Sequence, residues 1–80
     1  MPARKKVGLN LIVGANIRRL RLRKNMTQQD LADAVEAQQA SISGLESGDR
    51  GASMLMVMNI AKALGVPSTS LFKEIKGKET

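Results

Sequence analysis

The sequence contains no cysteine and no histidine. Disulfide scaffolds, zinc fingers, thiol chemistry and imidazole general bases are therefore excluded. Phe72 is the only aromatic residue, which argues against modules that stack exposed rings on nucleic-acid bases. The apolar stretches are too short to cross a bilayer or to form the core of a secretory signal. We therefore expect a cytoplasmic protein with no cofactor, no metal ion, no evident small-molecule ligand and no membrane partner.

Basic residues are concentrated toward the N-terminus. Eight of the 13 lysines and arginines lie within the first 25 residues, which contain no acidic residue, and the formal net charge is +6. The remaining 55 residues hold five basic and seven acidic side chains. One end of the protein is therefore a positive surface suited to a polyanion. A basic helix that only improves solubility is the alternative interpretation.

The length of 80 residues predicts a single domain with a small core. We expect a basic, flexible arm over residues 1–9, one compact domain over residues 10–76 and a frayed polar tail over residues 77–80. The arm could lie along a polyanion or be no more than a disordered tail. A core of this size provides only marginal stability, so a partner subunit could help to bury apolar surface.

The spacing of apolar residues predicts an all-α fold of five short helices. Asn10 is the expected N-cap of the first helix, and Asn25 can end it. Thr27 and Asp30 have the spacing of a capping box, which begins the second helix. The expected buried face of the first helix consists of Leu9, Ile12, Val13, Ile17 and Leu20.

The last two helices are expected in the C-terminal third of the chain. Ser53 can cap a fourth helix that runs to Leu64 and stops at Gly65. The expected apolar side of this helix consists of Met54, Val57, Met58, Ile60, Ala61 and Leu64. Ser68 is the expected cap of a fifth, short helix with one apolar face, made of Leu71, Phe72 and Ile75.

The third helix, expected from Gln38 or Gln39 to Ser47 and ended by Gly48, has an unusual outward face. It carries amides and hydroxyls rather than a mixture of lysine and glutamate. A helix fits the major groove of DNA, and a glutamine amide can bond in two places to an adenine edge. The backbone N–H groups at Gln28 and Gln39 could also bind phosphate. An ordinary polar surface is the alternative for the glutamines.

One ordered set of residues runs from Ile17 to Phe72 without a gap. It consists of Ile17-Arg18, Leu20-Arg21, Thr27-Gln28, Leu31-Ala32, Ile42-Ser43, Leu45-Glu46, Gly48, Ile60-Ala61-Lys62-Ala63-Leu64-Gly65-Val66 and Leu71-Phe72. Through this set the sequence resembles the phage-repressor-like helix-turn-helix domains of the Xre/Cro type. The resemblance implies a lambda-repressor-like fold in which the second and third helices form the helix-turn-helix. It also implies a non-enzymatic, nucleoid-associated regulator of transcription that binds double-stranded DNA.

The resemblance assigns roles to particular residues of the third helix and its surroundings. Arg21 and Glu46 are implied to form a structural ion pair, with a phosphate contact as the alternative for Arg21. The implied base-contacting residues are Gln39, Ala40, Ser43 and Gly44. The implied phosphate-contacting residues are Gln28, Gln38, Arg50 and Ser53.

The sequence departs from the family pattern at Glu36-Ala37 and at Gly44. Glu36-Ala37 replaces the usual glycine-containing turn between the second and third helices, so a residue with a side chain must adopt the turn conformation. Gly44 stands where a longer side chain often reaches the bases. This glycine either allows a close approach to DNA or removes one contact.

One recognition helix reads too few base pairs to find a genomic site, so we expect a homodimer on a palindromic operator. The candidate dimer contact is the fifth helix, through Leu71, Phe72 and Ile75. A dimeric autorepressor or controller protein is the favoured function. The alternatives are an antitoxin-like interaction module, which binds a protein partner as well as DNA, and an RNA-binding protein. Phage, restriction–modification and toxin–antitoxin settings all fit the sequence.

Overall fold

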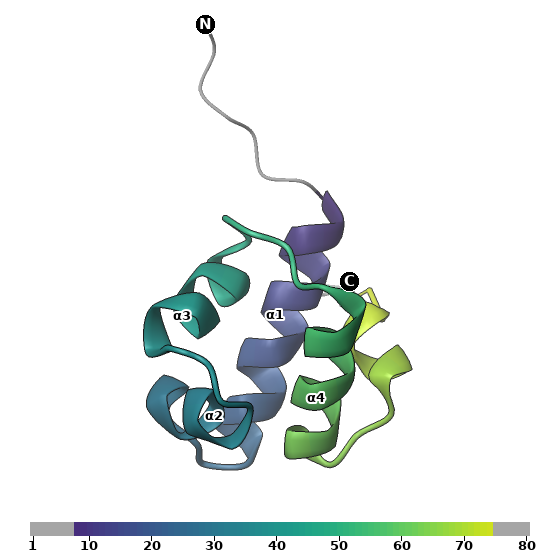
Figure 1. Ribbon diagram of the computed structural model, residues 1–80. Coiled ribbons are helices and arrows are strands. Elements are labelled where there is room, and N and C mark those ends of the chain that lie inside the picture. The colour runs from purple at the N-terminus through teal and green to yellow at the C-terminus, as the bar shows by residue number, and fades with distance from the viewer. Residues whose placement is uncertain (1–7, 75–80) are drawn as a thin grey trace, which may run out of the picture.

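The computed structural model describes residues 8–74, which form four α-helices and one 3-10 helix (Figure 1). The elements are α1 (Gly8–Arg23), α2 (Gln28–Ala34), α3 (Gln39–Ser47), α4 (Met54–Leu64) and η1 (Ser68–Phe72). No strand occurs within the described range. The all-α prediction is confirmed, but the fifth element is a 3-10 helix of five residues rather than an α-helix. The predicted tail and most of the predicted arm lie outside the described residues.

The helix ends follow local signals at most positions. The Thr27 hydroxyl accepts a bond from the Asp30 N–H, and the Asp30 carboxylate accepts one from the Thr27 N–H, both at 2.9 Å. This confirms the capping box. Ser53 caps α4 by accepting from the Met56 N–H at 3.1 Å. The predicted stops at Gly48 and Gly65 are also confirmed, with φ of +83° and +72°.

Two predicted caps are wrong. α1 begins at Gly8, so Asn10 lies inside the first turn and is not the N-cap. Gly8 and Leu9, which were expected in the arm, belong to this helix. The N-cap of η1 is Pro67, and no side chain bonds to the start of this helix, so Ser68 does not cap it. A proline at this position already holds its φ near the required value, and the backbone can turn without a hydroxyl.

α1 lies at the centre of the fold, with α2 and α3 on one side and α4 and η1 on the other (Figure 1). All five elements contribute to one core, whose largest fully buried apolar side chains are Ile17, Leu31, Ile42, Ile60 and Leu71. Three residues predicted in apolar core faces are instead exposed, namely Leu9, Met54 and Met58.

A buried amide attaches η1 to the centre of the fold. Asn16 is fully buried, and its Nδ2 donates to the carbonyl oxygens of Leu71 and Lys73 at 2.9 and 2.7 Å. Its Oδ1 accepts from Arg19 at 2.9 Å. Both ends of the amide are thus bonded, which a fully buried polar group requires. Asn16 therefore positions the C-terminal segment against α1, a role that the sequence analysis did not predict.

Candidate nucleic-acid interface

The helix-turn-helix consists of α2, a tight turn and α3. The turn contains no glycine, and Glu36 itself adopts the left-handed conformation, with φ of +57°. The Ala37 N–H donates to the Ala32 carbonyl at 2.8 Å, which closes the turn. Ala32 is fully buried, as expected for a small residue where two helices approach closely. The Glu36-Ala37 sequence therefore still forms a tight turn between α2 and α3. The backbone of Glu36 is strained, because residues with a side chain rarely adopt the left-handed conformation.

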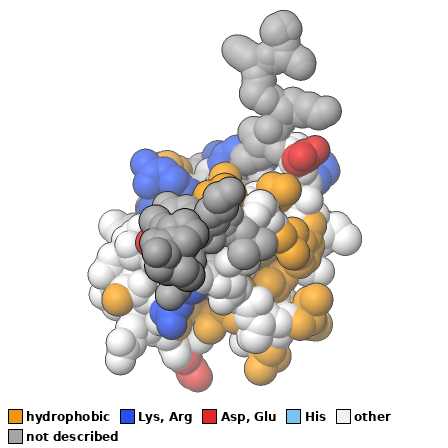
Figure 2. Space-filling model, turned by 90° about the horizontal axis from the view of Figure 1, so that it is seen from above, with side chains coloured by type: hydrophobic (Ala, Val, Ile, Leu, Met, Phe, Trp, Pro, Cys, Tyr) orange, Lys and Arg blue, Asp and Glu red, His pale blue; other side chains and the backbone are white. Residues whose placement is uncertain are grey.

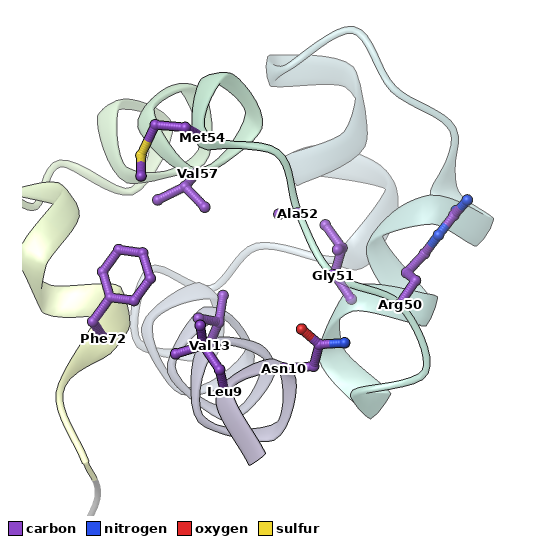
Figure 3. Close-up of a pocket in the computed structure, with 10 residues that line it drawn as sticks. Leu9, Asn10, Val13, Arg50, Gly51, Ala52, Met54, Val57 and Phe72 are labelled. Atoms are coloured by element: carbon purple, nitrogen blue, oxygen red, sulfur yellow. The ribbon is translucent and has the colours of Figure 1, made fainter. Parts of the chain in front are cut away.

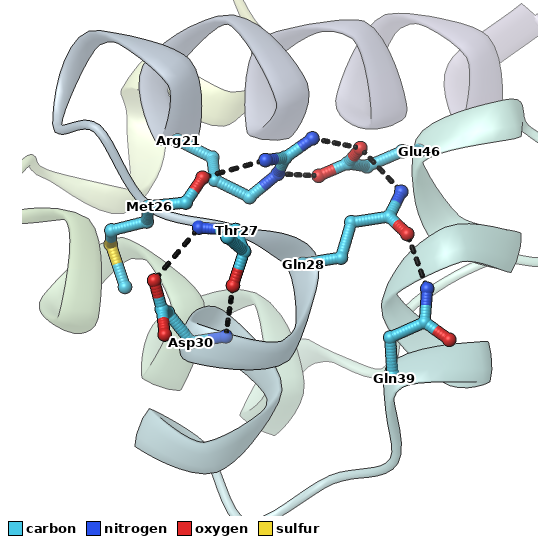
Figure 4. A network of polar contacts seen from close by, with 7 residues as sticks. All are labelled: Arg21, Met26, Thr27, Gln28, Asp30, Gln39 and Glu46. Carbon is cyan, nitrogen blue, oxygen red and sulfur yellow. Dashed lines mark hydrogen bonds and ion pairs between the residues drawn. The ribbon is translucent and has the colours of Figure 1, made fainter.

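A buried ion pair joins α1 to α3 (Figure 4). Arg21 Nε donates to Glu46 Oε2 at 2.6 Å, and Arg21 Nη2 donates to Glu46 Oε1 at 3.0 Å. Arg21 Nη1 donates to the Met26 carbonyl at 2.7 Å. The two side chains are only 6% and 3% exposed. The pair is therefore internal, and every nitrogen of the guanidinium bonds within the domain, so the phosphate alternative for Arg21 lacks support.

The pairing also affects the titration of Arg21. The hydrogen bond with Glu46 raises the pKa of the guanidinium above its ordinary value, although desolvation opposes this change. A raised folded-state pKa gives a stabilising contribution that is complete below the unfolded-state pKa. The contribution is lost only as pH rises through the folded-state value. Arg21 therefore stays charged, and its contribution to stability does not change, near neutral pH.

Two glutamine amides extend the ion pair to the surface (Figure 4). Gln28 Nε2 donates to Glu46 Oε1 at 3.0 Å. Gln39 Nε2 donates to Gln28 Oε1 at 2.5 Å. Gln28 is the first residue of α2 and Gln39 the first of α3, so the two helix N-termini are directly linked. The sequence analysis placed both residues at helix starts but did not predict this link.

The predicted base-contacting residues all lie on α3, but their exposure differs. Gln39 and Ala40 are exposed, whereas Ser43 and Gly44 are half-buried. A Cβ on Gly44 would lie 2.7 Å from Cδ of Arg50, and Arg50 Nη1 donates to Ser41 Oγ at 3.2 Å. Gly44 therefore provides space for the Arg50 side chain to cross α3, an explanation that the sequence analysis did not consider.

The predicted phosphate-contacting residues lie in two groups. Gln28 and Gln38 lie at the adjoining N-termini of α2 and α3, where backbone N–H groups favour anions. Gln38 is exposed and its side chain makes no capping bond, whereas the half-buried Gln28 amide is already bonded. Arg50 and Ser53 are both exposed in the loop between α3 and α4. Both groups therefore lie next to α3, at its start and beyond its end.

The predicted dimer contact needs correction. Leu71 is fully buried in the core of its own chain, and Ile75 lies outside the described residues. A leucine that packs against α1 and α4 cannot also contact a second subunit. Phe72 is 38% exposed, so it is the only described residue of the predicted contact that reaches the surface.

Exposed apolar side chains of α1, α4 and η1 lie outside the core, and we call this set the α4 face. It consists of the exposed residues Leu9, Met54, Leu55, Met58 and Phe72. Hydrophobic side chains gather on this side of the molecule in Figure 2. Leu9, Met54 and Phe72 also line a cavity of about 160 Å³ between α1, α4 and η1 (Figure 3). An apolar surface of this kind typically marks an interaction site.

Within residues 8–74, no helix has the length and apolar character needed to cross a membrane.

A family model described as "Helix-turn-helix" matches residues 17–71. The chain is 38% identical over 64 residues to control protein C.BamHI of Bacillus amyloliquefaciens, covering 79% of each protein. It is 37% identical over 60 residues to the competence pilus inhibition repressor of Acinetobacter baylyi, covering 75% of this chain but only 54% of that protein. The structure of the restriction–modification controller protein C.AhdI from Aeromonas hydrophila superposes with a TM-score of 0.76 at 28% identity, over 79% of this chain and 96% of that one.

Proposed function

This chain belongs to the Xre/Cro-type helix-turn-helix family of DNA-binding transcriptional regulators, and we propose that it acts as a dimeric autorepressor or controller protein. Its site would be a palindromic operator read through the major groove. The exposed start of α3, with Gln39 linked to the N-terminus of α2, is the observation that supports this proposal most directly. Binding to genomic DNA would place the protein at the nucleoid, and the proposal includes no catalytic activity.

The proposed contacts follow from the chemistry of the α3 surface. Gln39 would bond to a base edge, with Ala40 and Ser43 beside it in the groove. The N-termini of α2 and α3 would face phosphates, because their free N–H groups and helix dipoles favour anions. Arg50 would add a charged phosphate contact beyond the end of α3. The relatives named as controller proteins make a restriction–modification setting the first one to examine.

A nuclease footprint on the DNA upstream of the gene tests this function. At near-physiological salt and with excess competitor DNA, we expect protection of a palindromic site. Its half-sites should lie about 34–36 Å apart or a multiple of that distance. Diffuse protection that disappears as salt rises would contradict a sequence-specific regulator, since non-specific binding depends mainly on counterion release.

Gln39→Ala should weaken binding to the preferred site by about 1–3 kcal/mol and relax the preference at one base pair. The reason is that alanine removes both hydrogen bonds of the amide with the base edge. Fluorescence anisotropy on the footprinted duplex and its single-base-pair variants would measure both effects. Gln29→Ala is the matched control, because Gln29 is also exposed but bonds only to Asp33 on α2. Equal losses for the two variants would argue against a base contact by Gln39.

We further propose that the α4 face is the dimer contact, in place of the contact through Leu71. Met54 of α4 lines one cavity with Leu9 and Phe72, and Leu55 and Met58 are exposed on the same helix. Covering such a surface with a second copy would remove it from water, which stabilises the dimer by about 25 cal/mol per Å² of apolar area. A two-fold dimer uses the same surface on both subunits.

Met58→Glu should weaken the dimer about tenfold or more, since it would place an unpaired charge in an apolar contact. Met58 is 55% exposed, so the fold of the monomer should persist. Sedimentation equilibrium would measure the dissociation constant, with the exposed neighbour Asn59→Glu as control. An unchanged constant would exclude this face. Loss of a complex with another protein, with the dimer intact, would instead favour the antitoxin-like interaction module.

A further inference from the structure

We propose that the cavity between α1, α4 and η1 binds a small, neutral aromatic molecule, a simple phenol with one ring and one hydroxyl group (Figure 3). This site goes beyond the proposed function, which requires only DNA and a second copy of the chain. The inference uses no DNA contact. The volume of the cavity, the side chains at its open side and one polar group at its edge each support this class of ligand.

The volume of the cavity matches a single aromatic ring. The cavity measures about 160 Å³, and apolar protein cavities of about 150 Å³ bind benzene. Its inner wall includes Val13, Leu45 and Val57, which are all buried. These side chains offer water no hydrogen bond, whereas a stable buried water needs several polar partners. An aromatic ring can therefore enter without displacing well-bound water from this wall.

Two side chains at the open side favour an aromatic ring over an aliphatic chain. Phe72 of η1 and Met54 of α4 both line the cavity, and Figure 3 shows the phenyl ring and the methionine sulfur at the same end of it. A ligand ring can pack against the phenyl ring in an offset or edge-to-face arrangement. The thioether sulfur makes favourable contacts with the edge of an aromatic ring. An aliphatic chain would gain neither interaction.

Asn10 provides a polar group at the edge of the cavity. Its half-buried side chain lines the cavity from the first turn of α1. Gly51 lies directly against this side chain, since a Cβ on Gly51 would be 2.9 Å from Asn10 Oδ1. Within residues 8–74, no group forms a hydrogen bond with the Asn10 amide. A ligand hydroxyl could therefore donate to Oδ1 or accept from Nδ2, which a hydrocarbon could not do.

The position of Arg50 indicates that the ligand is neutral. Arg50 is the only charged residue among the described residues that line the cavity. Its Nη1 donates to Ser41 Oγ on α3 at 3.2 Å, and Figure 3 shows its guanidinium directed away from the cavity. A carboxylate inside the cavity would lose its hydration without gaining a cationic partner. The hydroxyl of a phenol does not need such a partner.

Titration of the full chain with p-cresol tests the inference, followed by the methyl resonances of the valines in heteronuclear NMR spectra. We expect saturable shifts at Val13 and Val57, with a dissociation constant of about 1 mM or lower. Val35 is the internal control, because it lies in a different groove, between α2 and α4. Its resonances should not shift.

A comparison of p-cresol with p-xylene isolates the contribution of the hydroxyl group, because the two molecules have nearly the same shape. Asn10→Leu should lower the ratio of the p-cresol affinity to the p-xylene affinity by about 3- to 10-fold, since leucine cannot bond to the hydroxyl. A ratio that does not change would overturn the assignment of a phenol.

Met54→Ala tests the open side of the cavity. It should weaken p-cresol binding by about 2- to 10-fold, because the sulfur contact with the ring is lost. Met54 is largely exposed, so the domain should remain folded. Met58→Ala is the matched control, because Met58 is also exposed on α4 but does not line the cavity. Equal losses for the two variants would contradict binding in this cavity.

Two further results would overturn the inference. The first is the absence of saturable shifts up to the solubility limit of p-cresol. The second is an affinity for p-cresol that falls as the protein concentration rises, which would mean that a side chain of a second copy occupies the cavity. Either result would leave the proposed function intact, because the footprint on DNA requires no ligand.

Discussion

Arg21→Met should lower the free energy of unfolding by about 3–5 kcal/mol, because it leaves the Glu46 carboxylate buried without its charged partner. Glu46 is only 3% exposed, so water cannot readily replace the guanidinium. The same change removes the bond to the Met26 carbonyl, which fixes the chain just before the capping box of α2. Urea unfolding followed by circular dichroism would measure the loss as a lower midpoint at a similar slope.

Arg18→Met is the matched control for this prediction. Arg18 lies on the same helix one turn earlier and is exposed, so its replacement should change stability by less than about 0.5 kcal/mol. The double variant Arg21→Met with Glu46→Met should recover much of the loss, since replacing a whole buried pair with apolar groups is often close to neutral. A single Arg21→Met variant as stable as wild type would show that the pair contributes little.

Gly14→Ala should destabilise the domain by about 1–3 kcal/mol or more, through overpacking where α1 crosses α3. A Cβ at this position would lie 2.1 Å from the Leu45 carbonyl oxygen and 2.9 Å from that of Glu46. Backbone atoms cannot move aside as a flexible side chain can, so the helices must separate. Their separation would also disturb Glu46 and the glutamines that depend on it. Thermal unfolding would show a lower Tm, and anisotropy would show weaker DNA binding.

Gly8→Ala provides the control on the same helix. A Cβ there meets no atom within 4 Å, and alanine favours a helix over glycine by up to about 1 kcal/mol. Gly8→Ala should therefore leave the Tm unchanged or raise it slightly. If both glycine variants behaved alike, the change at Gly14 would reflect helix propensity, and the close contact between α1 and α3 would be doubtful.

Local signals explain why much of the fold could be predicted. The Thr27–Asp30 capping box, the Ser53 cap and the left-handed stops at Gly48 and Gly65 each involve residues within a few positions of one another. Their hydrogen bonds form wherever the chain begins or ends a helix, whatever packs against it. The order of the helices could also be predicted, because it follows from the spacing of apolar residues along the chain. The predicted N-cap at Asn10 is wrong because α1 already begins at Gly8.

The sequence by itself therefore determined the helical class, the main helix boundaries and the polar start of α3. Only the tertiary structure decided which apolar residues are covered. Leu71 and Met54 look alike in an apolar pattern, yet one is fully buried and the other is 63% exposed. The tertiary structure also decided the roles of Gly14 and Asn16. It placed Gln39 within hydrogen-bond distance of Gln28, and Gln28 within hydrogen-bond distance of Glu46. These contacts connect residues on different elements, and their geometry exists only once the helices have packed.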